Sequence, residues 1–239
     1  MKNMTLVSIN WNQLPALTLL LKSYVRHHYS GNPLSLLLAD NGSNDGSKEW
    51  LRENEIPFID LPENIGHEIA LNIIYPDIKT KYALLCDSDI EFLANVYCYL
   101  SYMQGNCVSV GELVENAVLN GKKLKPRIGP WFWLFEYQLM RQAGIHTWRD
   151  TKDWTYDTGS WFWEQMHSRG YTNHNLVRKP FIKGSGIGYQ YEKFNHFGSV
   201  SWDLKLLPEH AAEINLRRNC INTKLNSYQD IDLRGKFIC

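Results

Sequence analysis

The stretch Tyr82-Ala83-Leu84-Leu85-Cys86-Asp87-Ser88-Asp89 decides how this chain of 239 residues is interpreted. Its apolar run predicts a buried strand, and two aspartates follow that strand at positions i and i+2. Carboxylates this close repel each other unless a cation lies between them. Because hard cations prefer oxygen ligands, the pair favours Mg2+ or Mn2+ over zinc, with a diphosphate as the usual companion. An ordinary strand-to-helix turn, where Asp and Ser are favoured, is the alternative interpretation.

The residues before Asp87 alternate between strand and helix patterns. The predicted elements are a strand over 5–9, a helix over 14–28, a strand over 34–39, a helix over 47–54, a strand over 57–61 and a helix over 66–75. This alternation predicts a parallel sheet, and ligands bind such sheets at the carboxyl ends of the strands. The polar residues that follow the strands are Asn10 and Asn12, the loop 40–47, the segment 63–67 and Asp87-Ser88-Asp89.

These segments resemble the family 2 glycosyltransferases of the GT-A fold, which use nucleotide-diphosphate sugars. The resemblance rests on Val-Ser-Ile-Asn-Trp-Asn at 7–12, the loop 40–47, Asn-Ile-Gly at 64–66 and Asp-Ser-Asp at 87–89, in the family's order and at roughly its spacing. It is clear over residues 4–92, weaker to 200 and absent beyond. Two departures are Asn-Trp-Asn where Pro-Thr-Tyr-Asn is more common, and Asn41 where a second Asp is common. Neither removes a group needed for a metal.

The resemblance implies an α/β chain that forms a single GT-A domain over residues 1–239. A Rossmann-like, mostly parallel sheet would be flanked by helices, with a small antiparallel subdomain on the acceptor side. Residues 1–92 would form the half that binds the nucleotide sugar, residues 93–205 the acceptor and catalytic half, and residues 206–239 a helical tail. A chain of this length can bury one large core, which favours a single domain over two.

The resemblance also implies a donor site. Asp40 would accept a hydrogen bond from the imide N–H of uracil or thymine, which cytosine lacks, so a UDP- or dTDP-sugar is favoured. Glycines at 42 and 46 let the backbone turn closely, and Asp45 and Ser47 are expected to cap the next helix. A helix N-terminus at His67 offers N–H groups to an anion, although a solvated histidine is equally consistent. The expected donor-binding residues are Asn10, Asn12, Asp40, Gly42, Ser43, Asn64, Gly66, His67, Asp87 and Ser88.

The family pattern makes Asp89 a direct metal ligand, while Asp87 contacts the ribose or reaches the metal through water. His196, in the late segment 194–202, would complete the shell, since imidazole is an acceptable manganese ligand. A partly buried structural histidine is the alternative. The glycine-rich run 183–188 is expected to be a mobile loop beside the donor, with Lys183 helping to neutralise the diphosphate.

The resemblance implies that Asp157 is the general base. It precedes a helix predicted within 154–171, and an Asp or Glu at the start of the corresponding helix deprotonates the acceptor in related transferases. A capping carboxylate without chemistry is the rival, and Asp150, Asp153 and Glu164 are further candidates. A strand is expected over 131–135. Seven of the nine tryptophans lie between 131 and 202; core packing explains most of them, and Trp131 or Trp154 is expected to line an acceptor groove.

Lys plus Arg equals Asp plus Glu at 25 each, which argues against a nucleic-acid partner bound through a broad basic surface. No 18-residue apolar segment or signal peptide is evident, and five cysteines without metal or disulfide spacing favour a reducing cytoplasm. A helix over 208–218 would carry Arg217 and Arg218 in its last turn, followed by a polar tail of open role. Contact of these arginines and Lys224 with acidic lipids is left open, and a solvated helix end is favoured.

Together with the aspartate pair, the resemblance implies a Mn2+- or Mg2+-dependent, inverting hexosyltransferase of polysaccharide biosynthesis. It would move a sugar from a UDP- or dTDP-sugar to a hydroxyl of a glycan or glycoconjugate by single displacement. A sugar-nucleotide nucleotidyltransferase is the first alternative, although the Asn10-Trp11-Asn12-Gln13 loop is not the glycine-rich basic loop expected of one. A catalytically silent carbohydrate-binding relative is the second.

Overall fold

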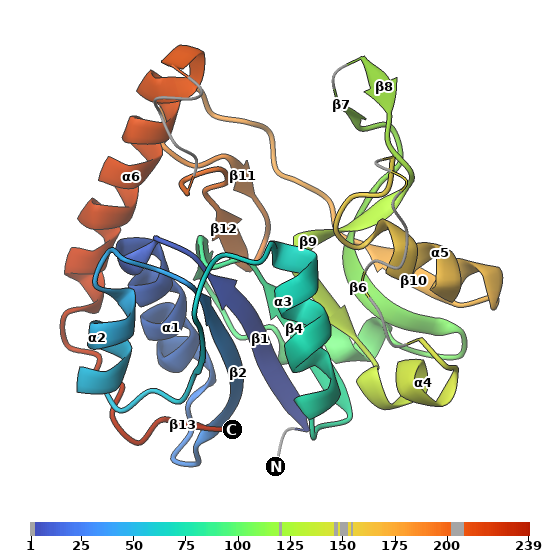
Figure 1. Ribbon diagram of the computed structural model, residues 1–239, viewed down its shortest axis with the longest axis horizontal. Helices are drawn as coiled ribbons and strands as arrows, with labels where there is room; N and C mark the ends of the chain where they lie inside the picture. The colour runs from blue at the N-terminus through green and yellow to red at the C-terminus, as the bar shows by residue number, and fades with distance from the viewer. Residues whose placement is uncertain (1–2, 120, 146–147, 149–152, 154, 202–207) are drawn as a thin grey trace.

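The computed structural model describes residues 3–119, 121–145, 148, 153, 155–201 and 208–239 (Figure 1). Its centre is an eight-stranded sheet with the order β10-β6-β9-β4-β1-β2-β13, in which β3 also pairs with β2. The strands of this sheet are β1 (Met4–Asn10), β2 (Leu34–Asn41), β3 (Ile59–Leu61), β4 (Tyr82–Cys86), β6 (Cys107–Val114), β9 (Arg127–Phe135), β10 (Thr172–Asn175) and β13 (Phe237–Ile238).

Helices cover both faces of this sheet (Figure 1). They are α1 (Leu14–His28), α2 (Ser47–Glu53), α3 (His67–Ile74), α4 (Tyr137–Gln142), α5 (Ser160–Ser168) and α6 (Ala211–Leu225). Short 3-10 turns are η1 (Tyr75–Asp77), η2 (Tyr97–Tyr102), η3 (Pro208–His210) and η4 (Asn226–Tyr228). A second, antiparallel sheet has the order β11 (Tyr189–Gln190), β12 (Phe194–His196), β5 (Ile90–Phe92), and a hairpin joins β7 (Val118–Leu119) to β8 (Lys122–Lys123).

The large sheet is mostly parallel, as the sequence predicts. Within the described residues, β9 alone runs against its neighbours β4 and β6, while β1 pairs in parallel with β2 and with β4. The carboxyl ends of β1, β2 and β4 therefore meet at one edge, the upper edge in Figure 1. Asn10 and Asn41 end two of these strands, and Asp87 directly follows the third.

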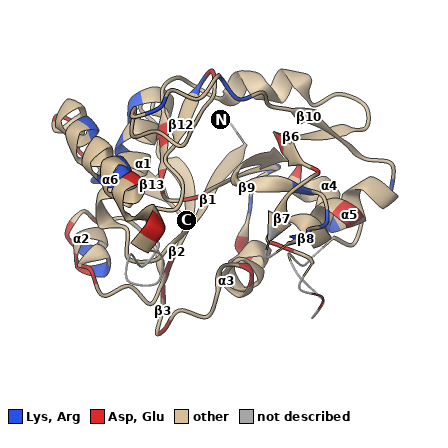
Figure 2. Ribbon diagram, turned by 90° about the horizontal axis from the view of Figure 1, so that it is seen from above, with Lys and Arg blue, Asp and Glu red and all other residues tan. Residues whose placement is uncertain are grey.

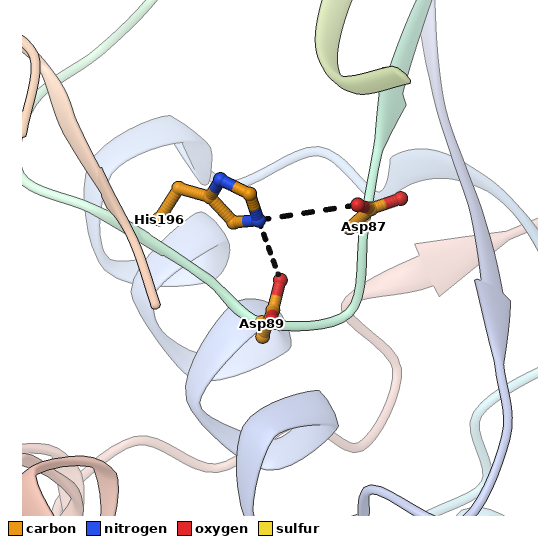
Figure 3. A group of neighbouring side chains, drawn as sticks. All are labelled: Asp87, Asp89 and His196. Atoms are coloured by element: carbon orange, nitrogen blue, oxygen red, sulfur yellow. Dashed lines mark ion pairs between the residues drawn. The ribbon is translucent and has the colours of Figure 1, made fainter. Parts of the chain in front are cut away.

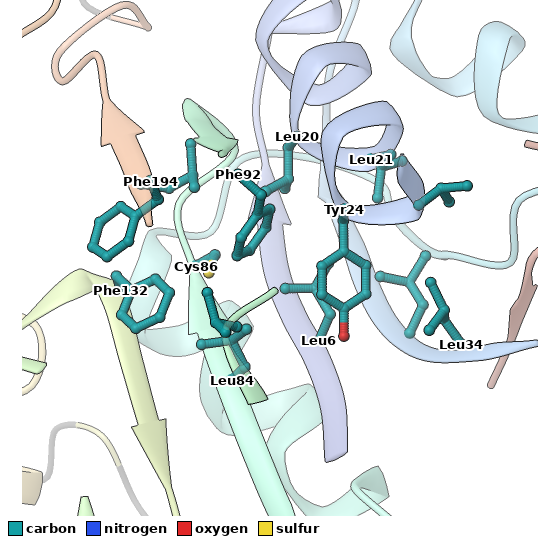
Figure 4. Packing of buried hydrophobic residues seen from close by; sticks show 14 of the residues in the cluster. Leu6, Leu20, Leu21, Tyr24, Leu34, Leu84, Cys86, Phe92, Phe132 and Phe194 are labelled. Carbon is teal, nitrogen blue, oxygen red and sulfur yellow. The ribbon is translucent and has the colours of Figure 1, made fainter. Parts of the chain in front are cut away.

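Alternating side chains of the central strands fill two separate cores, because successive residues of a strand point to opposite faces. Leu6 and Leu84 pack against Leu20, Leu21 and Tyr24 of α1 on one face (Figure 4). A strand that is buried on both faces has a continuous apolar sequence, which explains why residues Tyr82 to Cys86 of β4 do not alternate with polar ones. Each fully buried aliphatic side chain contributes about 1.5–3 kcal/mol.

The opposite face of the sheet is covered by α3 and α5. Val7 follows Leu6, and Leu85 follows Leu84, so both side chains point to this second face. They pack in one cluster with Leu71 of α3 and with Phe162 and Met166 of α5. The helix predicted within 154–171 is shorter than that range, beginning at Ser160 and ending at Ser168. Gly170, at φ +79°, lies just beyond its end, where a left-handed glycine commonly terminates a helix.

The C-terminal part differs from the prediction. The helix expected to end at Arg218 continues to Leu225, so Arg217 and Arg218 do not lie in its last turn. Burial of Ile221 against α1 extends the helix, because this contact stabilises turns that lack strong helix formers. The tail then returns to the large sheet, where Phe237 pairs with Leu34 of β2. No described helix has the length and apolar character needed to cross a membrane.

Candidate active site

Asp87, Asp89 and His196 come together at the carboxyl edge of the sheet (Figure 3). The Nε2 atom of His196 lies 3.2 Å from Oδ1 of Asp89 and 4.0 Å from Oδ2 of Asp87. One ligand atom from each of the three residues lies within 4.8 Å of the others. Asp89 and His196 are buried, whereas the side chain of Asp87 is 32% exposed. Two carboxylates and an imidazole around one point form a donor set suited to Mn2+, while Mg2+ would use the carboxylate oxygens alone.

Strand pairing explains why these residues meet. Asp89 immediately precedes β5, and β12 pairs antiparallel with β5 so that His196 lies opposite Ile90. The backbone N–H of Phe197 also donates to the Asp89 carbonyl at 3.0 Å. The segment that carries His196 is therefore joined by regular strand pairing to the segment that carries Asp89. The predicted grouping of His196 with Asp87 and Asp89 is present in the structure.

The electrostatics of Asp87 favour a bound cation. Burial raises the pKa of the Asp87 carboxyl, the nearby His67 lowers it, and the charge of Asp89 raises it again. His67 Nε2 lies 3.8 Å from Asp87 Oδ1. Oδ1 of Asp89 is buried and, although His196 Nε2 lies 3.2 Å away, it accepts no hydrogen bond from the described residues. A divalent cation would supply the missing partner and relieve the repulsion between the two carboxylates.

A cavity of about 370 Å³ opens beside the two aspartates. Of the residues expected to bind the donor, it is lined by Asn64, Gly66, His67, Asp87 and Ser88. The lining that the sequence analysis missed comprises Ile9, Trp11, Gln13, Asn41, Pro130, Ser199 and Ser201. Ser199 and Ser201 follow His196 closely, so their position next to a predicted ligand was the available signal.

The remaining expected donor residues do not line this cavity. Asp40 is fully buried, and its carboxylate accepts hydrogen bonds from Asn10 Nδ2 and from the backbone N–H of Ser43, both at 2.8 Å. Asn12 accepts from the backbone N–H of Asn44 at 2.8 Å, and its own N–H donates to Ser43 Oγ. In this structure these four side chains hold the loops together, and Asp40 exposes no surface to a ligand.

Asn41 and Gly42 connect the β2 loop to the segment that precedes α3. Asn41 Nδ2 donates to Asn64 Oδ1 at 2.9 Å, and Asn41 Oδ1 accepts from the backbone N–H of Ile65. Gly42 has φ +77°, and a Cβ there would lie 2.4 Å from the Glu63 carbonyl carbon. Only glycine allows this close approach. The predicted capping of α2 by Asp45 and Ser47 is wrong in detail, because Gly46 is the N-cap residue and forms no side-chain cap. Asp45 instead accepts hydrogen bonds from the backbone N–H and the hydroxyl of Ser47, the first residue of the helix.

Asp157 lies before α5 with its carboxylate 44% exposed. Oδ2 is 2.9 Å from Arg127 Nη1, and Oδ1 accepts from the backbone N–H of Thr158 at 2.8 Å. Asp157 is not among the residues that line the cavity, but its charge contributes to the raised pKa of Asp87. Of the fallback candidates, Asp153 binds Thr155, Glu164 accepts from the Tyr156 hydroxyl, and Asp150 lies outside the described residues, as does Trp154.

Lys183 and Trp131, which were expected beside the donor and the acceptor, make other contacts in this structure. Lys183 is exposed and lines a different cavity next to α6, so it does not lie beside the aspartate pair. Trp131 stacks on the ring of His196, with centroids 5.4 Å apart and an interplanar angle of 11°. Its indole N–H donates to the Tyr191 hydroxyl at 3.1 Å. Trp131 thus supports His196, and its contact with an acceptor stays a prediction.

Comparison with known proteins accounts for this architecture. A family model described as glycosyl transferase family 2 matches residues 5–147, which is more than half of the chain. The chain belongs to glycosyl transferase family 2. The matched range contains Asp40, Asn64 and the aspartate pair, whereas Asp157 and His196 lie beyond it. This glycosyltransferase therefore takes its third candidate ligand from a part of the chain that the family model does not cover.

Individual relatives are more distant. A teichoic acid poly(glycerol phosphate) polymerase of Staphylococcus epidermidis is 34% identical over 76 residues, which is 29% of this chain and 10% of that protein. The mannosyltransferase PcManGT from Pyrobaculum calidifontis, solved with GDP-Man and Mn2+, superposes with a TM-score of 0.57 at 15% identity, covering 72% of this chain and 54% of that one. S. aureus TarS superposes with a TM-score of 0.52 at 12% identity, and the match covers 69% of this chain and 33% of the TarS chain. The glycosyltransferase thus spans about half or less of the length of these proteins, and the two structures show that the fold is shared.

Proposed function

We propose that this glycosyltransferase is metal-dependent and inverting, and transfers a sugar from a nucleoside-diphosphate sugar to a hydroxyl group of a glycan or glycoconjugate. The observation that carries the proposal is the Asp87, Asp89 and His196 cluster at the edge of a cavity of about 370 Å³. The presence of GDP-Man and Mn2+ in the structure of PcManGT supports this assignment. The identity of Asp40 favours a UDP- or dTDP-sugar, but its carboxylate is buried against Asn10 and Ser43 in this structure, so the donor panel below decides the nucleotide.

Asp89 and His196 would hold the cation, and Asp87 would contact it or the ribose. A divalent ion bound there supplies Lewis acidity that neutralises the charge of the departing diphosphate. His67 and the N-terminus of α3 face the same cavity and favour an anionic group near Asp87. Asn64, fixed by Asn41, shapes the adjoining wall.

Asp157 would remove the acceptor proton as the hydroxyl oxygen attacks the anomeric carbon. The Arg127 guanidinium and the Thr158 N–H orient the carboxylate while leaving it accessible to solvent. The new glycosidic bond forms as the bond to the diphosphate oxygen breaks, and the proton passes to Asp157. A single displacement of this kind inverts the configuration at the anomeric carbon.

The test is a panel of UDP-, dTDP- and GDP-sugars incubated with the purified protein and MnCl2, with release of nucleoside diphosphate as the readout. We expect one donor class to be consumed, and consumption to stop in EDTA. Asp89→Ala should abolish metal-dependent nucleotide binding. Asp157→Asn should lower transfer about a thousandfold, within the usual range for a lost general base, and leave nucleotide affinity nearly unchanged.

Asp153→Asn is the matched control, because Asp153 is an exposed carboxylate in the same segment whose partner is Thr155. Full activity of Asp157→Asn would remove Asp157 from the mechanism, and loss of activity in Asp153→Asn alone would identify that residue as the base. Release of pyrophosphate from a nucleoside triphosphate and a sugar phosphate would instead indicate a nucleotidyltransferase. Sugar binding without turnover of any donor would indicate a silent relative.

A further inference from the structure

The segment between β10 and β11 exposes large apolar side chains. Val177 is 78% exposed, Phe181 64% and Ile182 58%. Tyr189, at the start of β11, and Leu216, in α6, add further exposed apolar surface nearby. Isolated exposed apolar residues need no explanation, but several on one short segment mark an interaction surface.

Positive charge accompanies these side chains. Residues 177–190 contain Arg178, Lys179 and Lys183 and no Asp or Glu, although the whole chain carries equal numbers of acidic and basic residues. Lys179 and Lys183 are exposed. In the view from above, the blue of lysine and arginine recurs along the chain between β10 and β12 (Figure 2). We call Val177, Lys179, Phe181, Ile182 and Lys183 the basic apolar loop.

The base of this loop is fixed to the rest of the protein. A Cβ at Gly186 would lie 2.7 Å from Cys220 Cβ of α6, so the backbone packs directly on that helix. Arg178 forms an ion pair with Glu112 and lies 3.9 Å above the ring of Tyr189. The loop therefore projects from an anchored base, and the exposure of Phe181 and Ile182 results from this placement.

The loop also lies on the side of the molecule that carries the candidate active site. Tyr189 ends the segment and pairs in register with His196, and their rings are 5.5 Å apart. In Figure 1 the chain leading from β10 to β11 passes along the upper side, to which the carboxyl ends of β1 and β4 point. A surface that contacts the loop would consequently lie close to the opening of the donor cavity.

We propose that the basic apolar loop binds the surface of an anionic phospholipid bilayer. Its apolar side chains are more than half exposed and protrude, which suits insertion among lipid head groups rather than reception of a partner's side chain. Lysines beside such side chains are attracted to anionic lipid, each contributing roughly fivefold in affinity. The cations of α6 do not share this role, because Arg217 donates to the Gly198 carbonyl, Arg218 to the Val200 carbonyl, and Lys224 pairs with Glu91.

The experiment measures sedimentation of the purified protein with vesicles of phosphatidylcholine alone and with vesicles that contain 40 mol% (about two in five lipids) phosphatidylglycerol. We expect binding to the anionic vesicles that weakens as salt is raised. Lys179→Gln with Lys183→Gln should reduce the affinity about twenty-fivefold, from two cations at roughly fivefold each. Phe181→Ser with Ile182→Ser should reduce it at least about tenfold by removing the inserted apolar area.

Matched controls lie at the opposite edge of the sheet. Lys79→Gln with Lys81→Gln removes two cations that precede β4, and Ile238→Ser removes a 52% exposed apolar side chain of β13. These variants should bind vesicles like the unmodified protein. The proposal is overturned if the protein does not bind anionic vesicles at low salt, or if controls and loop variants lose affinity equally. It is also overturned if Phe181→Ser with Ile182→Ser converts a dimer to a monomer, measured by light scattering, without changing vesicle binding. No nucleotide is present, so failure here leaves the proposed transfer reaction untouched.

Discussion

His196 is oriented by an aromatic ring. Its Nδ1 atom is buried and has no hydrogen-bond partner among the described residues, whereas histidines that bind metals usually donate from the second ring nitrogen. The indole of Trp131 lies parallel to the imidazole at 5.4 Å, and the Tyr191 hydroxyl holds the indole N–H. Tyr191 in turn donates to Glu112. Ring stacking thus replaces the usual hydrogen bond as the constraint on the direction of Nε2.

Replacing Trp131 with Leu should therefore weaken the metal site without removing a ligand. We expect the affinity for Mn2+ to fall about tenfold, the lower end of what is seen when a supporting group of a metal ligand is lost. Isothermal titration of the protein with MnCl2 measures this. Trp131→Phe retains a ring and should keep most of the affinity. Equal affinity of Trp131→Leu and the unmodified protein would show that stacking does not orient His196.

Single residues differ in how far their roles could be predicted. The aspartate pair was identifiable because both carboxylates follow one apolar run. The burial of Asp40 could not be predicted, because its partner Asn10 lies 30 residues away in the sequence. The two residues become neighbours only through the pairing of β1 with β2. Asn41 was noted only as a departure from a family pattern, yet it links the β2 loop to Asn64.

Among the elements, α6 has the most consequences for the site. Its Lys224 lies 2.7 Å from Oε2 of Glu91, a buried carboxylate of β5 that also accepts from Asn195 of β12. Arg217 and Arg218 donate to carbonyls of the segment that carries Ser199. The helix therefore contacts the chain on both sides of His196.

Lys224→Met should destabilise the protein by about 3 kcal/mol, because it leaves the charge of Glu91 buried without its cation. Urea unfolding followed by tryptophan fluorescence measures the change. The double substitution of Lys224→Met with Glu91→Gln should recover most of the loss, since the amide carries no charge, its oxygen can still accept from Asn195 Nδ2, and its NH2 can donate to the Tyr228 hydroxyl. A double variant as unstable as Lys224→Met would show that the helix contact, rather than the buried charge, matters.

The elements up to β4 were predicted to within about two residues because periodicity and turn residues are local signals. The length of α6 could not be predicted, because its last two turns depend on the packing of Ile221 against α1. The return of the tail to β2 could not be predicted either, since Phe237 and Leu34 lie at opposite ends of the chain and their pairing leaves no local pattern.

For the whole molecule, the cavity beside Asp87, Asp89 and His196 predicts that the nucleotide and the metal bind together. UDP with MnCl2 should stabilise the folded protein by about 2.7 kcal/mol at a hundredfold excess over Kd, while UDP in EDTA should have little effect. Thermal unfolding of the protein, with and without Asp89→Ala, measures this. The variant should not respond to the metal. An equal rise in Tm with UDP in EDTA would show that the nucleotide binds without a cation.

The pairing of β5 with β12 has a further consequence during synthesis. Glu91 and Asn195 are 104 residues apart, and Glu91 and Tyr228 are 137 apart. On the ribosome, the aspartate pair emerges long before the histidine and the helix that complete its surroundings. Contacts of such wide separation form late in folding. We expect the nascent chain to remain unable to bind nucleotide with metal until α6 has been released, so that sugar donors meet only the finished enzyme.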